Sequence, residues 1–71
     1  MAETIETIAP GNVWKVFVKA GDEVAEGDVL FILELMKTEV PHPAPRAGRI
    51  AAVMIAEGES VEAGDAAVSL A

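Results

Sequence analysis

Cysteine and tyrosine are absent from this chain of 71 residues, and histidine occurs once, at position 42. Without cysteine no disulfide can stabilise the fold, and His42 alone excludes an ordinary zinc cluster. A chain of this length buries only ~60% of the surface that its unfolded form exposes. We therefore predict a single domain over residues 1–71, whose stability depends on a compact apolar core and favourable turns.

Long apolar runs are also missing. Apolar residues make up 52% of the chain, but no run approaches the ~20 residues of a membrane span. The first residues, Met1-Ala2-Glu3-Thr4, lack the basic start of a signal peptide. These features predict a cytoplasmic protein with no membrane among its partners.

Basic residues are scarce. Twelve Asp and Glu residues against five Lys and Arg residues give a net charge of −7. This charge repels phosphate backbones, so we expect no nucleic acid among the partners. Proteins and small molecules remain as the expected partners.

What the chain does contain is a series of short runs of β-branched and apolar residues, separated by glycine followed by an acid. No stretch keeps a helical spacing over a helix length, so the pattern predicts an all-β fold. We expect strands over residues 3–8, 11–18, 29–34, 38–43, 48–55 and 67–70, with short pairings around Val24 and Val61.

The same pattern occurs twice in the chain. A shift of 37 positions superimposes Gly11 on Gly48, Val16 on Val53, Gly21 on Gly58, Gly27 on Gly64 and Leu33 on Leu70. The chain is therefore a duplicated half-domain with four strands in each half. If a twofold axis relates the halves, both termini lie together at the end opposite the junction, which falls at Lys37.

Equivalent strands of the two halves share an uneven apolar spacing. The positions after the glycine are Val13, Val16 and Val18 in one half, and Ile50, Val53 and Ile55 in the other. Simple alternation would not point all three inward, whereas a β-bulge between the first two does so and also bends the strand. We therefore predict a bulge in each half and burial of all six side chains.

Trp14 and Phe17 fall outside this inward spacing. They are expected to form an exposed apolar patch for docking, or, in the case of Trp14, to lie flat over the barrel.

Four glycines, Gly21, Gly27, Gly58 and Gly64, are each followed by an acid. Glycine suits a turn with positive φ, and the acid can bond the local backbone. The segment Pro41-His42-Pro43-Ala44-Pro45 lacks three backbone donors and therefore suits an edge strand.

Lys37 lies in Glu34-Leu35-Met36-Lys37-Thr38-Glu39, a short segment between two predicted strands. We expect a tight turn with the lysine at or beside its tip. Lysine amines form covalent bonds as an imine in a desolvated pocket or as an amide to an activated acid. A chain this small offers little material for the pocket that an imine requires. A projecting turn suits an amide-linked group, because a modifying enzyme can enclose it.

Taken together, these motifs resemble the biotinyl and lipoyl carrier domains. The resemblance rests on Gly-x-Val-x-x-Val-x-Val, Gly-Asp-x-Val-x-x-Gly-Asp, Glu-x-Met-Lys and the second glycine framework, and it covers residues 5–70. The stretch 11–22 is similar to stand-alone biotin/lipoyl attachment proteins. The resemblance implies a flattened antiparallel β-barrel, a barrel-sandwich hybrid of two four-stranded sheets with internal pseudo-twofold symmetry.

The resemblance also implies a cofactor and partners. Biotin acceptors of this family usually have methionine on both sides of the lysine, and here Met36 precedes Lys37 while Thr38 follows it. The segment after the turn is similar to lipoyl domains, so lipoate is the alternative to covalent biotin. The implied partners are a biotin protein ligase, a biotin carboxylase and a carboxyltransferase acting on an acyl-CoA or a 2-oxo acid.

Residues beside Lys37 have competing interpretations. Met36 is expected either to serve ligase recognition or to fill a gap at the barrel end. Glu34 is expected either to pair with Lys37 or to orient the turn for the ligase, and Thr38 belongs to the same recognition segment. The implied function is a non-catalytic carboxyl carrier; a lipoyl carrier, an unmodified interaction module and, least favoured, an independent enzyme are the alternatives.

Overall fold

The computed structural model describes residues 3–71; residues 1 and 2 of the expected domain lie outside the described residues. Eight strands follow one another along the chain: β1 (Glu3–Glu6), β2 (Gly11–Val16), β3 (Glu23–Val24), β4 (Val29–Leu35), β5 (Thr38–Pro43), β6 (Gly48–Val53), β7 (Ser60–Val61) and β8 (Ala66–Leu70). Within residues 3–71 no helix is long and apolar enough to cross a membrane.

The strands form two four-stranded antiparallel sheets, with the orders β1-β8-β6-β3 and β5-β4-β2-β7. The 37-residue shift of the sequence repeat converts the first order into the second, strand by strand. The expected barrel of two sheets with pseudo-twofold symmetry is confirmed. Each sheet contains two strands from each half of the sequence, so the halves are interleaved.

Both predicted β-bulges are present. The pairing of β2 with β4 shifts between Val13 and Lys15, and the pairing of β6 with β8 shifts between Ile50 and Ala52. The bulges fall at equivalent positions in the repeat, as the uneven apolar spacing predicts.

The core lies between the sheets and consists of Val13, Leu30, Phe31, Leu33, Ala44, Ile50, Ile55, Val61, Ala67, Val68 and Leu70. The prediction of six buried positions is correct for Val13, Ile50 and Ile55. It is wrong for Val16, Val18 and Val53, which are half-buried and pack against the edge of this cluster. A domain of this size has little interior, so inward positions near strand ends still reach its surface.

The turns have the predicted chemistry. Gly21, Gly27, Gly58 and Gly64 have φ values of 96°, 90°, 89° and 88°. After each glycine, a carboxylate accepts a hydrogen bond from the backbone N–H three residues earlier, at 2.8 to 3.1 Å. The four acids are Asp22, Asp28, Glu59 and Asp65.

Strand ends differ from the predicted ones by a few residues. Three predicted strands end two residues early, β1 at Glu6, β2 at Val16 and β6 at Val53. After Glu6 the Thr7 N–H donates to the Asp65 carbonyl at 2.9 Å and the Gly64 N–H donates to the Thr7 carbonyl at 2.8 Å, so Thr7 stays bonded to the segment that precedes β8.

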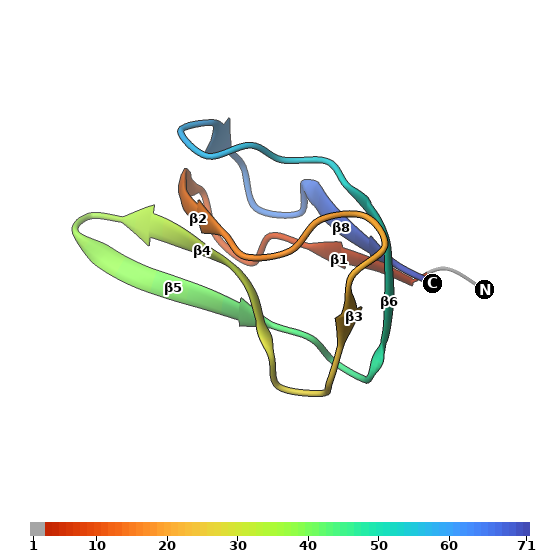
Figure 1. Cartoon of the computed structure of the whole chain (residues 1–71). Coiled ribbons are helices and arrows are strands. Elements are labelled where there is room, and N and C mark those ends of the chain that lie inside the picture. Colours follow the sequence, from red (N-terminus) through yellow and green to blue (C-terminus); the bar gives the residue numbers. More distant parts are fainter. Residues whose placement is uncertain (1–2) are drawn as a thin grey trace.

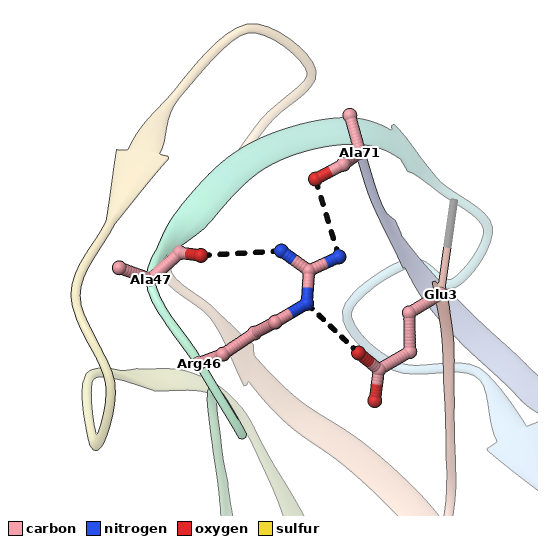
Figure 2. Close-up of polar contacts among 4 residues, drawn as sticks. All are labelled: Glu3, Arg46, Ala47 and Ala71. Atoms are coloured by element: carbon pink, nitrogen blue, oxygen red, sulfur yellow. Dashed lines mark hydrogen bonds and ion pairs between the residues drawn. The ribbon is translucent and has the colours of Figure 1, made fainter. Parts of the chain in front are cut away.

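Arg46 connects the two ends of the described chain (Figure 2). Its guanidinium donates to the Glu3 carboxylate at 3.0 Å and to the Ala71 carbonyl at 3.3 Å. The β4–β5 hairpin projects from the opposite end of the barrel (Figure 1), as the twofold argument predicts.

Candidate functional site

The β4–β5 hairpin ends in a two-residue turn. Leu35 pairs with Thr38, which leaves Met36 and Lys37 as the turn residues, with φ values of 51° and 66°. Two successive positive φ values are typical of a type I′ turn, which matches the twist of a hairpin. Neither residue is glycine, so each adds about 1–2 kcal/mol of backbone strain. The prediction of a tight turn with Lys37 at its tip is confirmed.

The hairpin that supports this turn is paired on both sides of β4 and closely packed at its base. Strand β4 lies between β5 and β2, and its Leu33 side chain is fully buried. Gly11 allows β2 to approach closely, because a Cβ there would lie 2.7 Å from the Glu34 carbonyl oxygen. Strand β5 is an edge strand, as its prolines predict.

Met36 and Lys37 are both exposed at the tip, and the Met36 side chain is 90% exposed. The interpretation of Met36 as a gap filler at the barrel end is therefore wrong. Met36 is one of the two turn residues beyond the last strand pair, Leu35 with Thr38, and so lies outside the sheets. Met36 remains available for recognition by another protein.

The carboxylates near the turn are not paired with Lys37. Glu34 lies directly opposite Glu39 on the neighbouring strand, and both are exposed. Among residues 3–71 the two ion pairs are Arg46 with Glu3 and Arg49 with Glu23. The alternative in which Glu34 pairs locally with Lys37 is therefore not observed. Thr38 is exposed beside the turn.

Trp14 and Phe17 are 43% and 56% exposed, which agrees with their position outside the inward spacing. The Lys15 ammonium lies 5.8 Å from the centre of the Trp14 ring. Trp14 thus keeps a large part of its ring in solvent.

His42 is a residue whose role the sequence reasoning missed. It is 3% exposed and stacks on Phe31 with ring centres 4.3 Å apart. Its Nε2 accepts from the Ile8 N–H at 3.1 Å, so Nδ1 carries the proton and donates to the Val40 carbonyl, also at 3.1 Å. Burial lowers its pKa, although the bond to Val40 acts in the opposite direction. The repeat gave a sequence signal for the burial of His42, because the equivalent position in the first half, 37 residues earlier, is the apolar Ile5.

The described residues contain neither a pocket nor a cluster of three metal-binding side chains. Fold and site together define a protein that displays a lysine at the tip of a strained turn on a two-sheet barrel. The chain belongs to the biotin/lipoyl family, described as "Biotin-requiring enzyme", whose profile matches residues 1–70.

Individual relatives agree with this assignment. The Biotin/lipoyl attachment protein of Bacillus subtilis is 43% identical over 67 residues, covering 94% of this chain and 92% of that protein. The Biotin carboxyl carrier protein of Streptococcus mutans is 40% identical over 70 residues, covering 99% of this chain and 54% of the relative.

Among solved structures, the urea carboxylase of Kluyveromyces lactis matches with a TM-score of 0.92 and 34% identity. The match covers 100% of this chain and 6% of that chain. The barrel described above is therefore also found as a small part of a much larger carboxylase.

Proposed function

We propose that this protein is a biotin carboxyl carrier, with biotin attached through an amide bond to Lys37. The observation that carries the proposal is the strained Met36-Lys37 turn, which exposes one amine at the end of a projecting hairpin. The name of the Streptococcus relative and the family description support biotin as the attached group, and the name of the Bacillus relative covers attachment of either biotin or a lipoyl group.

The residues present fit an amide-linked group. The described residues offer no pocket that would bind biotin without a covalent bond, whereas Lys37 is open to an enzyme that encloses the turn. In the proposed reaction the neutral amine attacks the acyl carbon of an adenylate held by a biotin protein ligase. The amide C–N bond forms, the bond to AMP breaks, and the amine loses its proton. Met36, Glu34 and Thr38 are the residues we assign to ligase recognition.

When bound, biotin would take up a carboxyl group at a biotin carboxylase and deliver it at a carboxyltransferase acting on an acyl-CoA or a 2-oxo acid. The chain itself carries out no catalysis in this scheme. Its sheets hold the base of the arm still, and tethering keeps the carried group near both enzymes at a millimolar effective concentration. We place this exchange in the cytoplasm, where ATP and bicarbonate are at hand for the carboxylase.

A lipoyl carrier is the second candidate. The acetyltransferase component of the pyruvate dehydrogenase complex of Mycoplasma capricolum, a dihydrolipoyllysine-residue protein by name, is 38% identical over 69 residues. We favour biotin because Met36 directly precedes the lysine, whereas lipoyl domains usually have aspartate there. In a third candidate, the domain is an interaction module whose Lys37 stays unmodified.

Intact mass after incubation with biotin ligase, lipoate ligase, ATP and both cofactors tests the three candidates. We expect one biotinyl amide on the parent protein and none on Lys37→Arg. Lys15→Arg and Lys19→Arg are matched controls, because both lysines are exposed along or after β2, and each should be modified like the parent. A lipoyl adduct, an unmodified parent, or a biotinylated Lys37→Arg variant would each contradict the proposal.

A further inference from the structure

The sheet β5-β4-β2-β7 carries Trp14 on the side that faces away from the core. Trp14 has no partner on β4, because Val13 pairs with Leu33 and Lys15 pairs with Ile32. Val13 and Leu33 are buried, and successive side chains of a strand point to opposite faces, so Ile32 and its partner Lys15 point outward. The Lys15 ammonium lies 5.8 Å from the centre of the Trp14 ring, which places Trp14 on the same outward side.

Two rows of partners cross this side of the three strands β2, β4 and β5. The row next to the turn carries an amide and two carboxylates, and the row further from it carries an ammonium and two apolar side chains. With Trp14 these rows form what we call the outer face: Asn12, Trp14, Lys15, Ile32, Glu34, Glu39 and Pro41. The outer face therefore suits a ligand that is apolar in one part and has hydrogen-bond donors and an acceptor in another. The ring system of biotin has this character, since a thioether ring is fused to a ureido group.

The outer face lies within reach of a group attached to Lys37. Trp14 is level with Leu33 and Ile32 on β4, and Leu35 is the last paired residue of that strand. Counted from the turn at ~3.4 Å per residue, Trp14 lies roughly 10–13 Å along the strands, and β2 is ~4.8 Å from β4. The arm from the Lys37 Cα to the biotin ring has about eleven bonds of ~1.5 Å and spans roughly 14 Å when extended. The ring system of a biotin on Lys37 can therefore contact Trp14.

We propose that biotin on Lys37 rests on the outer face between its visits to the enzymes, with its ring system against Trp14 and its ureido carbonyl toward the Lys15 ammonium. This inference rests on the proposed function. The described residues contain no pocket, so the contact is one with an open surface and is weak for free biotin. Tethering supplies a millimolar effective concentration, at which a contact with a millimolar dissociation constant is filled about half of the time. The attached group thus remains free to leave for an enzyme.

The fluorescence of Trp14 tests the proposal, because Trp14 is the only tryptophan of the chain. Its side chain is 43% exposed in the unloaded domain. Loading of biotin on Lys37 should shift the emission to shorter wavelength, because the ring system displaces water from the indole. The acrylamide quenching constant should fall by about a third for a contact that is filled half of the time. Nuclear Overhauser contacts between indole and biotin protons give a second readout.

Two variants serve as controls. Lys37→Gln removes the lysine charge without adding a ring system, and it should keep the emission of the unloaded parent. The double variant Trp14→Ala, Ala51→Trp moves the only tryptophan to the equivalent exposed position of the other sheet. Biotin on Lys37 should leave the emission of this variant unchanged, because the twofold relation places position 51 toward the end opposite the hairpin (Figure 1). Circular dichroism verifies that each variant is folded.

Intact mass separates this inference from the proposed function. A parent that takes up no biotin contradicts the proposed function and the resting site together. A biotinylated parent that has the emission and the quenching constant of the unloaded domain, and no Overhauser contact between Trp14 and biotin, overturns the inference alone. An equal spectral change in the double variant would assign the effect to the barrel as a whole, and that too overturns the inference.

Discussion

His42 shows how one residue can couple two distant segments. Its ring stacks on Phe31 inside the barrel, and its two nitrogens bond to the backbone of Ile8 and Val40. Both bonds require the neutral ring, because a protonated Nε2 would point a second donor at the Ile8 N–H. The buried histidine therefore stabilises the fold only while it is uncharged.

We predict a stability loss in mild acid that depends on His42. Burial lowers the pKa of His42 in the folded state, so the unfolded chain takes up the proton first. The contribution of neutral His42 to the free energy of unfolding is fully present above its pKa of ~6.5 in the unfolded chain. It is lost as pH falls toward the lower pKa of His42 in the folded state. Urea unfolding should therefore give a smaller free energy of unfolding at pH 5.5 than at pH 7.5.

His42→Phe is the comparison for this experiment, since it keeps an aromatic ring against Phe31 but does not titrate. The variant should be less stable at pH 7.5 by about 1–3 kcal/mol, because the Ile8 N–H loses its acceptor. Its free energy of unfolding should change less than that of the parent between the two pH values. Equal pH dependence in both proteins would assign the effect to the carboxylates.

At the scale of the element, the β4–β5 hairpin combines a strained turn with a tightly held base. Met36 and Lys37 adopt positive φ values although neither is glycine. The backbone strain at these two residues is offset by the six residue pairs between β4 and β5 and by the close packing of β2 on β4. Strained residues persist where the surrounding structure over-determines them.

We predict that Gly11→Ala loosens this base. The new Cβ would lie 2.7 Å from the Glu34 carbonyl oxygen, a backbone atom that cannot rotate away, so β2 and β4 must separate. The free energy of unfolding should fall by about 1–3 kcal/mol. Gly48→Ala is the matched control, because at the equivalent position the nearest atom is Arg46 Nη1 at 3.0 Å, the end of a flexible side chain. Urea denaturation should show the larger loss for Gly11→Ala; equal losses would contradict this explanation.

At the scale of the whole molecule, each half of the chain completes the other. The Gly21 N–H donates to the Ile50 carbonyl at 2.8 Å, and in the equivalent bond the Gly58 N–H donates to the Val13 carbonyl at 2.7 Å. A turn of each half is thus held by a strand of the other half. We therefore expect residues 1–71 to unfold as one cooperative domain.

Core truncation tests this expectation together with the observed burial. Ile50 is fully buried, so Ile50→Ala should cost about 2–5 kcal/mol by leaving a cavity. Val53→Ala removes a half-buried side chain and should cost less. Fluorescence of Trp14 and circular dichroism should give coincident urea transitions in both variants. Separate transitions, or a larger loss for Val53→Ala, would show that the domain is not one unit or that its core lies elsewhere.

The sequence by itself determined the features that depend on neighbouring residues. A glycine and a following acid specify a turn within four residues, and uneven apolar spacing specifies a bulge within one strand. The repeat then places Lys37 at the junction of equal halves. For these reasons the all-β fold, the bulges, the four glycine turns and the exposed lysine could be predicted before the structure was known.

Only the tertiary structure decided which distant residues meet. It assigns two strands of each half to each sheet, leaves Val16, Val18 and Val53 half-buried, places His42 against Ile8, and sets Glu34 opposite Glu39. These features depend on how two sheets stack and how strands far apart in the chain align. Local residue patterns contain no measure of either, because burial and pairing are properties of surfaces that exist only once the chain has folded.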